Sequence, residues 1–162
     1  MLKLSDNELH WYVANTCRQE KKIKQRLDSM GIENFIPFQQ IARKIHGVDK
    51  LIEVPVIPNL VFIHTTFKSC MSLIQEYAFD MRYLRDRETG NFLIVPDKQM
   101  HDFMFLLDFS PSGVEVLNKN LKRGDRVRVI KGPLQGLEGE LVRLMGHKRV
   151  VIRLEGVVSI AT

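Results

Sequence analysis

The residues that most often carry chemistry are scattered along this 162-residue chain. Its five histidines and two cysteines lack the spacing that would let several of them bind one metal ion. No Gly-x-Ser-x-Gly segment is present to hold a serine nucleophile on a sharp turn. Gly132, Gly136 and Gly139 suggest a phosphate-binding loop, but no Lys-Ser or Lys-Thr pair follows them, so structural turns are expected. We therefore expect a protein that is not an enzyme and uses no cofactor or metal.

Basic side chains in the first third of the chain give a stronger signal. A helix expected after residue 16 carries several on its outer face, and a hairpin expected over residues 34–54 carries others near its tip. Such side chains attract nucleic-acid phosphates, although a merely solvated helix face explains the first group equally well. The residues expected to bind nucleic acid are Arg18, Lys21, Lys22, Lys24, Arg43 and Lys44.

Residues 54–63 contain no charged side chain, and the first domain is expected to be organised around them. The continuous apolar run 60–63 is typical of a strand buried on both faces at the centre of a sheet. Pro58 cannot donate a ladder hydrogen bond and therefore marks where this strand begins. Two interpretations stay open. The segment is a core strand alone, or its turn offers apolar surface to a partner protein through Ile57, Pro58, Asn59 and Leu60.

A small α+β fold must position these groups. An aromatic, β-branched strand is expected over residues 10–15, followed by a helix that opens at the capping box 16–19. Residues 34–45 and 50–54 are expected to pair as a hairpin. A last helix is expected to start near Pro96, with an acidic residue in its first turn. The sequence therefore predicts an antiparallel sheet with flanking helices.

Charge and aromatic content divide the chain into two parts. Acidic and basic residues balance over residues 1–110, so the net charge of +5 comes from residues 111–162, which contain no Phe, Tyr or Trp. We expect one domain over residues 1–109, a linker over 110–121 and a second domain over 122–162. No apolar run has the length of a signal peptide or a membrane helix, and two cysteines imply no disulfide framework. A soluble, cytoplasmic protein that does not enter membranes is therefore expected.

The second domain shows short β segments separated by glycine turns, a pattern typical of a small barrel. It resembles the KOW motif, in which Gly-Asp turns the chain into a strand, valines face the core, and glycines fit positive φ or close backbone packing. The residues that carry the resemblance are Gly124, Asp125, Val127, Val129, Gly132, Pro133, Gly136 and Gly139. The resemblance implies an SH3-like β-barrel. KOW segments occur in transcription factors and in ribosomal proteins, so the fold alone does not choose between them.

The first domain resembles the N-terminal domain of the NusG/RfaH family of transcription elongation and antitermination factors. The resemblance rests on Trp11-Tyr12-Val13, the basic hairpin, residues 57–63 and the helix start at 95–100. It looks most like the specialised members, including the UpxY-type antiterminators of surface-polysaccharide operons. The resemblance implies a monomer that docks on the clamp helices of RNA polymerase and contacts non-template DNA in the transcription bubble. It also implies a KOW barrel that recruits another transcription or ribosomal protein.

One departure from the family pattern concerns the second domain. General NusG proteins usually carry aromatic residues after the KOW Gly-Pro pair, where this chain has Leu134 and Leu137. This difference argues against contact with the usual small-subunit ribosomal protein or with the termination factor Rho. Because single-stranded nucleic acid is usually held on aromatic platforms, we expect this domain to recruit a protein through Leu134, Leu137 and its strand edges. The alternative function is a ribosomal-type KOW protein that binds RNA.

Overall fold

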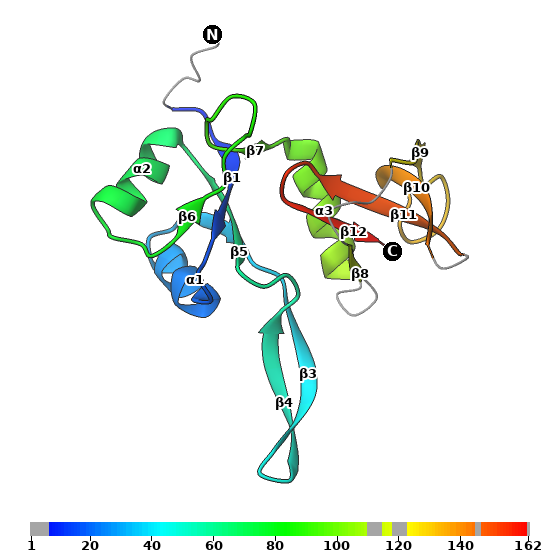
Figure 1. Cartoon of the computed structure of the whole chain (residues 1–162), viewed down its shortest axis with the longest axis horizontal. Helices are drawn as coiled ribbons and strands as arrows, with labels where there is room; N and C mark the ends of the chain where they lie inside the picture. The colour runs from blue at the N-terminus through cyan, green and yellow to red at the C-terminus, as the bar shows by residue number, and fades with distance from the viewer. Residues whose placement is uncertain (1–6, 110–114, 118–122, 145–146, 162) are drawn as a thin grey trace. The chain divides into compact units, whose positions relative to one another are not determined.

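The computed structural model describes residues 7–109, 115–117, 123–144 and 147–161. The chain divides into two compact units, Met1–Ile94 and Val95–Thr162 (Figure 1). Helices flank the sheet of the first unit, and a small antiparallel sheet forms most of the second. The predicted α+β class is therefore confirmed. No helix in the described part of the chain is long and apolar enough to cross a membrane.

The sheet of the first unit has its most buried strand in its interior. Its order is β2-β5-β1-β6, and β7 also pairs with β1. The strands are β1 (His10–Asn15), β2 (Glu33–Phe35), β5 (Leu60–Thr65), β6 (Arg82–Tyr83) and β7 (Ile94–Val95). Val61, Phe62 and Ile63 of β5 are fully buried although they alternate between the two faces. The prediction of a central strand buried on both faces is confirmed.

Two helices pack on one face of this sheet (Figure 1). They are α1 (Glu20–Ser29) and α2 (Phe67–Gln75). The α2 helix begins at Thr66, whose hydroxyl accepts a hydrogen bond from the Ser69 N–H (3.2 Å) as an N-cap. The main core cluster joins residues of β1, β5 and both helices: Ala14, Ile23, Leu27, Ile36, Val61, Ile63, Leu73, Phe79 and Met81. Alternation along β5 therefore sends Val61 and Ile63 to the helices, and Leu60, Phe62 and His64 to the other face.

The α1 helix does not open at the predicted capping box. It begins at Glu20, and its N-cap is Gln19, which makes no side-chain cap. Cys17 and Arg18 have φ values of 52° and 67°, outside the helical region. The reason is tertiary, because the Thr16 N–H donates to the Asn59 carbonyl (3.1 Å) and holds the chain in a turn. The N-cap therefore lies three residues later than the capping box predicted, at Gln19 instead of Thr16.

The hairpin is a separate two-stranded sheet that projects from the first unit (Figure 1). It consists of β3 (Phe38–Ile45) and β4 (Val48–Pro55). Its turn has only two residues, His46 and Gly47, with φ values of 53° and 79°. Positive φ at both central residues matches the twist of a two-residue hairpin. The two strands meet from the Phe38–Pro55 pair to the Ile45–Val48 pair. The second strand is therefore longer than the predicted 50–54, whereas the predicted strand 34–45 is divided into β2 and the shorter β3.

The second unit is built on a sheet of order β8-β12-β11-β10-β9. Its strands are β8 (Glu115–Leu117), β9 (Asp125–Arg128), β10 (Glu138–Leu144), β11 (His147–Leu154) and β12 (Val158–Ala161). Leu137, Val151, Leu154 and Ile160 are buried in this unit. The helix α3 (Asp97–Phe109) also belongs to it and contacts β11. The division by contacts thus lies before α3, whereas the sequence suggested a boundary after it.

Candidate protein and nucleic-acid interfaces

The predicted docking segment contains a fixed turn between β4 and β5. Asn59 has a φ of 64°, a left-handed conformation that asparagine tolerates better than most residues. Its N–H donates to Glu20 Oε1 (2.7 Å), and its carbonyl accepts the Thr16 N–H (3.1 Å). The turn is therefore tied to the beginning of α1 at two points. This contact links the predicted protein-binding segment to the predicted nucleic-acid-binding helix.

The four predicted polymerase-binding residues differ in exposure. Pro58 is exposed, and Asn59 and Leu60 are partly exposed. Ile57 is only 4% exposed, so a charge placed there would disturb packing before it disturbed any interface. The surface of this turn is therefore offered by Pro58 and Leu60, with Ile57 packed inside.

Leu60 lies on the sheet face opposite the helices, together with aromatic residues that the sequence analysis did not select. Trp11 of β1 pairs with His64 of β5, and their rings stack at 4.7 Å between centroids. His64 Nδ1 lies 2.7 Å from the carboxylate of Glu33 on β2. Phe62 lies between Leu60 and this pair along β5. Residues 60, 62 and 64 are two apart in the sequence, and this spacing indicates that their side chains share one face of the sheet.

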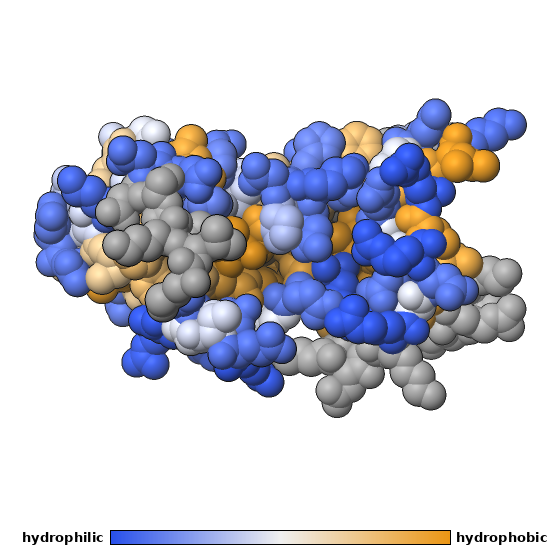
Figure 2. Space-filling model, turned by 90° about the horizontal axis from the view of Figure 1, so that it is seen from above, coloured by the Kyte–Doolittle hydropathy of each residue, from blue (hydrophilic) through white to orange (hydrophobic). Residues whose placement is uncertain are grey.

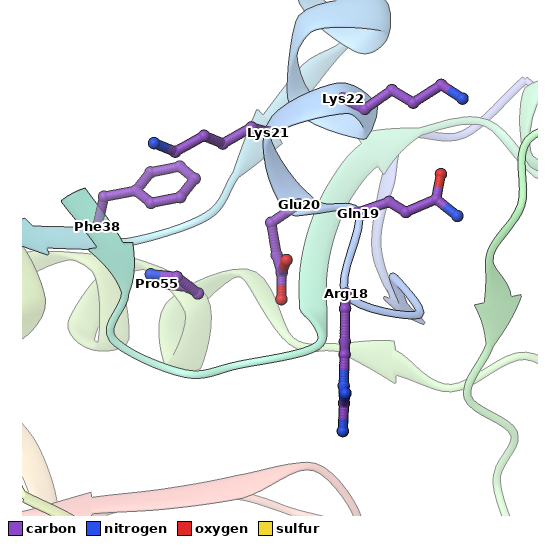
Figure 3. A pocket seen from close by; sticks show the side chains of 7 residues that line it. All are labelled: Arg18, Gln19, Glu20, Lys21, Lys22, Phe38 and Pro55. Atoms are coloured by element: carbon purple, nitrogen blue, oxygen red, sulfur yellow. The ribbon is translucent and has the colours of Figure 1, made fainter. Parts of the chain in front are cut away.

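A hollow of about 390 Å³ lies at the beginning of α1. Its lining combines basic side chains with an aromatic ring and a proline: Arg18, Gln19, Glu20, Lys21, Lys22, Phe38 and Pro55. Phe38 and Pro55 come from the first pair of the hairpin, and the other five come from the turn and first residues of α1. Figure 3 shows the Glu20 side chain pointing between Pro55 and Arg18. Phe38 was not among the predicted site residues, because only the folded hairpin brings it beside Pro55 and the beginning of α1.

The six basic residues predicted to bind nucleic acid fall into three groups. Arg18, Lys21 and Lys22 line the hollow together. Lys24 does not, because its Nζ donates to Asn34 Oδ1 (3.1 Å) and lies 3.6 Å from Asp28 Oδ2. The remaining two are exposed on the hairpin: Arg43 directly opposite Lys50 and Lys44 directly opposite Asp49. Like charges at opposing positions repel, so the Arg43–Lys50 pair favours an anionic neighbour.

The KOW glycines of the second unit serve backbone geometry. Gly132 and Gly136 have φ values of 94° and 91°, and the Gly136 N–H donates to the Val129 carbonyl (2.7 Å). A Cβ on Gly124 would collide with the Leu141 carbonyl, and one on Gly139 would collide with the Val151 carbonyl. Val127 and Val129 are half-buried, Asp125 begins β9, and Pro133 is exposed in the turn. The glycines among these residues therefore serve the backbone geometry of the fold.

Leu134 and Leu137, the two leucines expected to recruit a partner protein, differ in their exposure. Leu137 is 1% exposed, so the expectation that it presents apolar surface is wrong. The Leu137 N–H donates to the Leu134 carbonyl (3.1 Å), and the Leu137 side chain is buried within the second unit. Leu134 is partly exposed, and Ile130 is 82% exposed. Figure 2 shows hydrophobic surface between hydrophilic regions on the face that is drawn.

A buried ion pair braces the strands of the second unit. Arg153 Nε donates to Glu140 Oε2 (2.7 Å), and the Gly124 N–H donates to Glu140 Oε1 (3.2 Å). Burial alone would raise the pKa of Glu140. The hydrogen bonds from Arg153 and Gly124 and the charges of Arg153 and Arg123 outweigh burial, so this pKa lies below its ordinary value. Glu140 therefore has a structural role as an ionised carboxylate.

The described residues contain no group of three His, Cys, Asp or Glu side chains placed to hold a metal ion. Cys70 is buried, and burial raises the pKa of its thiol to about 12, which leaves it unreactive at neutral pH. Burial also raises the pKa of Tyr12 to about 12. The notable surfaces are therefore the exposed turn at Pro58 and the basic hollow beside it.

Comparison with known proteins identifies two family models in the chain. A search of curated proteins gave no match. Residues 9–104 match the family described as transcription termination factor NusG, and residues 123–153 match the KOW motif. The NusG family consists of transcription factors that are not enzymes, and the KOW motif occurs in such factors. The first match covers more than half of the sequence and includes the turn, the basic hollow and the hairpin. The chain therefore belongs to the NusG family.

Proposed function

We propose that this protein is a transcription elongation and antitermination factor that binds RNA polymerase. Family membership supports a role in transcript elongation or termination, and the finer activity is inferred from the site. The observation that carries the proposal is the Pro58–Asn59 turn, which is exposed and tied to α1 through Glu20. A rigid apolar turn loses little conformational entropy on binding, so it suits a groove between two partner helices. The polymerase clamp helices would supply that groove.

The basic residues around the hollow and on the hairpin extend this proposal to nucleic acid. Once docked, the factor would contact non-template DNA of the transcription bubble through Arg18, Lys21 and Lys22, and through Arg43 on the hairpin. The resemblance to UpxY-type proteins favours surface-polysaccharide operons as the targets. The KOW unit would recruit a further protein through Leu134 and Ile130, which are more exposed than Leu137.

The docking surface is tested with the double variant Pro58→Asp, Leu60→Asp. Placing two charges in an apolar interface removes their hydration, so co-purification with RNA polymerase should be lost while the far-UV circular dichroism spectrum stays unchanged. The matched control is Val48→Asp, Leu51→Asp, which alters two exposed apolar residues on the hairpin. Polymerase binding by a folded Pro58→Asp, Leu60→Asp protein would place the docking site elsewhere. Co-purification with ribosomes instead of polymerase would favour the ribosomal alternative.

A further inference from the structure

We propose that Phe38 is a stacking platform for an unpaired nucleobase of a single nucleic-acid strand, within the basic hollow at the beginning of α1. The inference deepens the proposed function, on which it rests for the presence of an open strand. It identifies what the hollow binds: a base on its apolar side, and phosphates on its basic rim. A hollow with charge alone would bind any phosphate backbone, whereas this one also contains an aromatic face.

The position of Phe38 makes its ring a fixed surface. Phe38 is the first residue of β3 and pairs with Pro55, the last residue of β4. The Phe38 side chain packs partly against the core cluster of the first unit and is only partly exposed. It also lines the hollow, as does Pro55. A ring held from behind by the core loses little freedom when a base stacks on its open side.

The charges around the hollow separate a place for phosphates from a place for the base. Arg18 and Lys22 are exposed, and neither forms an ion pair with another residue of the described chain. Lys21 is less available, because its Nζ lies 3.7 Å from Glu53 Oε1. The Glu20 carboxylate, held by the Asn59 N–H, would repel a phosphate in the interior of the hollow. Phosphates therefore belong at Arg18 and Lys22, and an uncharged base belongs against Phe38.

The geometry also distinguishes single strands from duplexes. Bases in a duplex are stacked on one another, so they cannot lie flat on a protein ring without first being unpaired. Basic grooves with aromatic platforms are the usual means of holding single strands, and their stacking tolerates different base sequences. The platform is therefore expected to act on any accessible unpaired base, with the flanking phosphates supplying salt-dependent affinity.

The test measures binding of the full-length protein to labelled oligonucleotides of about ten nucleotides by fluorescence anisotropy. The probes are an oligothymidine DNA strand, an oligouridine RNA strand, and a DNA duplex of the same length. Phe38→Leu should weaken binding to the strands about 5- to 150-fold, the range that corresponds to the loss of one stacked base. Phe38→Trp should restore strand binding. Duplex binding, which depends on phosphates, should stay unchanged.

Phe67→Leu is the matched control, since Phe67 is an exposed phenylalanine outside the hollow in the same unit. Melting temperatures of all variants establish whether Phe38→Leu remains folded, and Phe38→Trp keeps the test valid if it does not. Equal weakening for DNA and RNA strands supports stacking, because the ring does not contact the sugar hydroxyl. Strand affinity unchanged in folded Phe38→Leu, or strand and duplex binding lost together, would overturn the proposal. Polymerase co-purification of Phe38→Leu tests the proposed function separately, because that function requires Pro58 and Leu60.

Discussion

At the scale of single residues, the basic side chains are not equivalent. Arg18 and Lys22 line the hollow with their charges available, whereas Lys24 is engaged by Asn34 and Asp28. Of the other predicted cations, Lys21 lies near Glu53, and Arg43 and Lys44 lie on the hairpin. The sequence shows these charges but not which of them are available. Availability depends on which acidic side chains the fold places beside each cation.

A salt titration separates these roles. Replacing Arg18 and Lys22 by Gln should weaken binding to single-stranded DNA and make it less dependent on salt. The slope of log affinity against log salt should fall by about 0.7 for each phosphate contact removed. Lys24→Gln should leave that slope unchanged, because its cation is already engaged within the protein. An unchanged slope in the double variant would mean that this helix face is only solvated.

At the scale of elements, the second unit depends on one carboxylate shared by three segments. Glu140 on β10 accepts hydrogen bonds from Arg153 on β11 and from Gly124 just before β9. The pKa of Glu140 is lower in the folded chain than in the unfolded chain. The stabilisation is therefore fully present above the unfolded pKa and is lost as pH falls through the folded pKa.

The pH dependence of unfolding should report this carboxylate. Wild-type protein should lose stability as the pH falls below the ordinary pKa range of a glutamate, and Glu140→Gln should remove part of that loss. The variant should be less stable at neutral pH, because the ion pair between Arg153 and Glu140 is lost. Glu155→Gln is the control, because the exposed pair of Glu155 with Arg123 contributes little. Denaturant unfolding followed by circular dichroism across pH makes the measurement. Identical pH profiles for Glu140→Gln and wild type would contradict this role.

Several elements could be predicted from the sequence because local chemistry determines them. The uncharged run 60–63 identified β5, and the glycines at 132 and 139 have the positive φ or close backbone packing expected of them. The start of α1 could not be predicted, because a contact with Asn59, far away in the sequence, overrides the capping box. The burial of Leu137 could not be predicted either, because Leu134 and Leu137 are identical residues in the same turn and only folding buries one of them.

At the scale of the whole molecule, α3 raises the question of where one unit ends. The NusG family match extends to residue 104 and includes most of this helix, yet its contacts group it with the C-terminal strands. Its buried apolar side chains include Met100, Phe103, Leu106 and Leu107. Burial of a single large apolar side chain is worth about 1.5–3 kcal/mol, so α3 matters to whichever unit it covers.

Two fragments decide the question. Residues 95–162 and residues 111–162 should both show β structure by circular dichroism, but the longer fragment should melt at a higher temperature. The expected reason is that α3 contacts β11 and covers apolar surface there. Equal melting temperatures would mean that α3 stabilises the N-terminal unit, as a boundary near residue 109 predicts. The shorter fragment should show no sequence-selective RNA affinity, because residues 111–162 contain no Phe, Tyr or Trp.

The isolated hairpin has a consequence for how this protein can vary. Beyond the Phe38–Pro55 pair, β3 and β4 pair only with each other among the described strands. Side chains alternate with a period of two, so adding two residues to each strand would move the tip outward by about 7 Å and keep every face in place. The foot of the hairpin, with Phe38 in the hollow, would be unaffected. The length of the hairpin can therefore change by insertion at its tip. Binding by the hollow can change independently, by substitution at the foot of the hairpin.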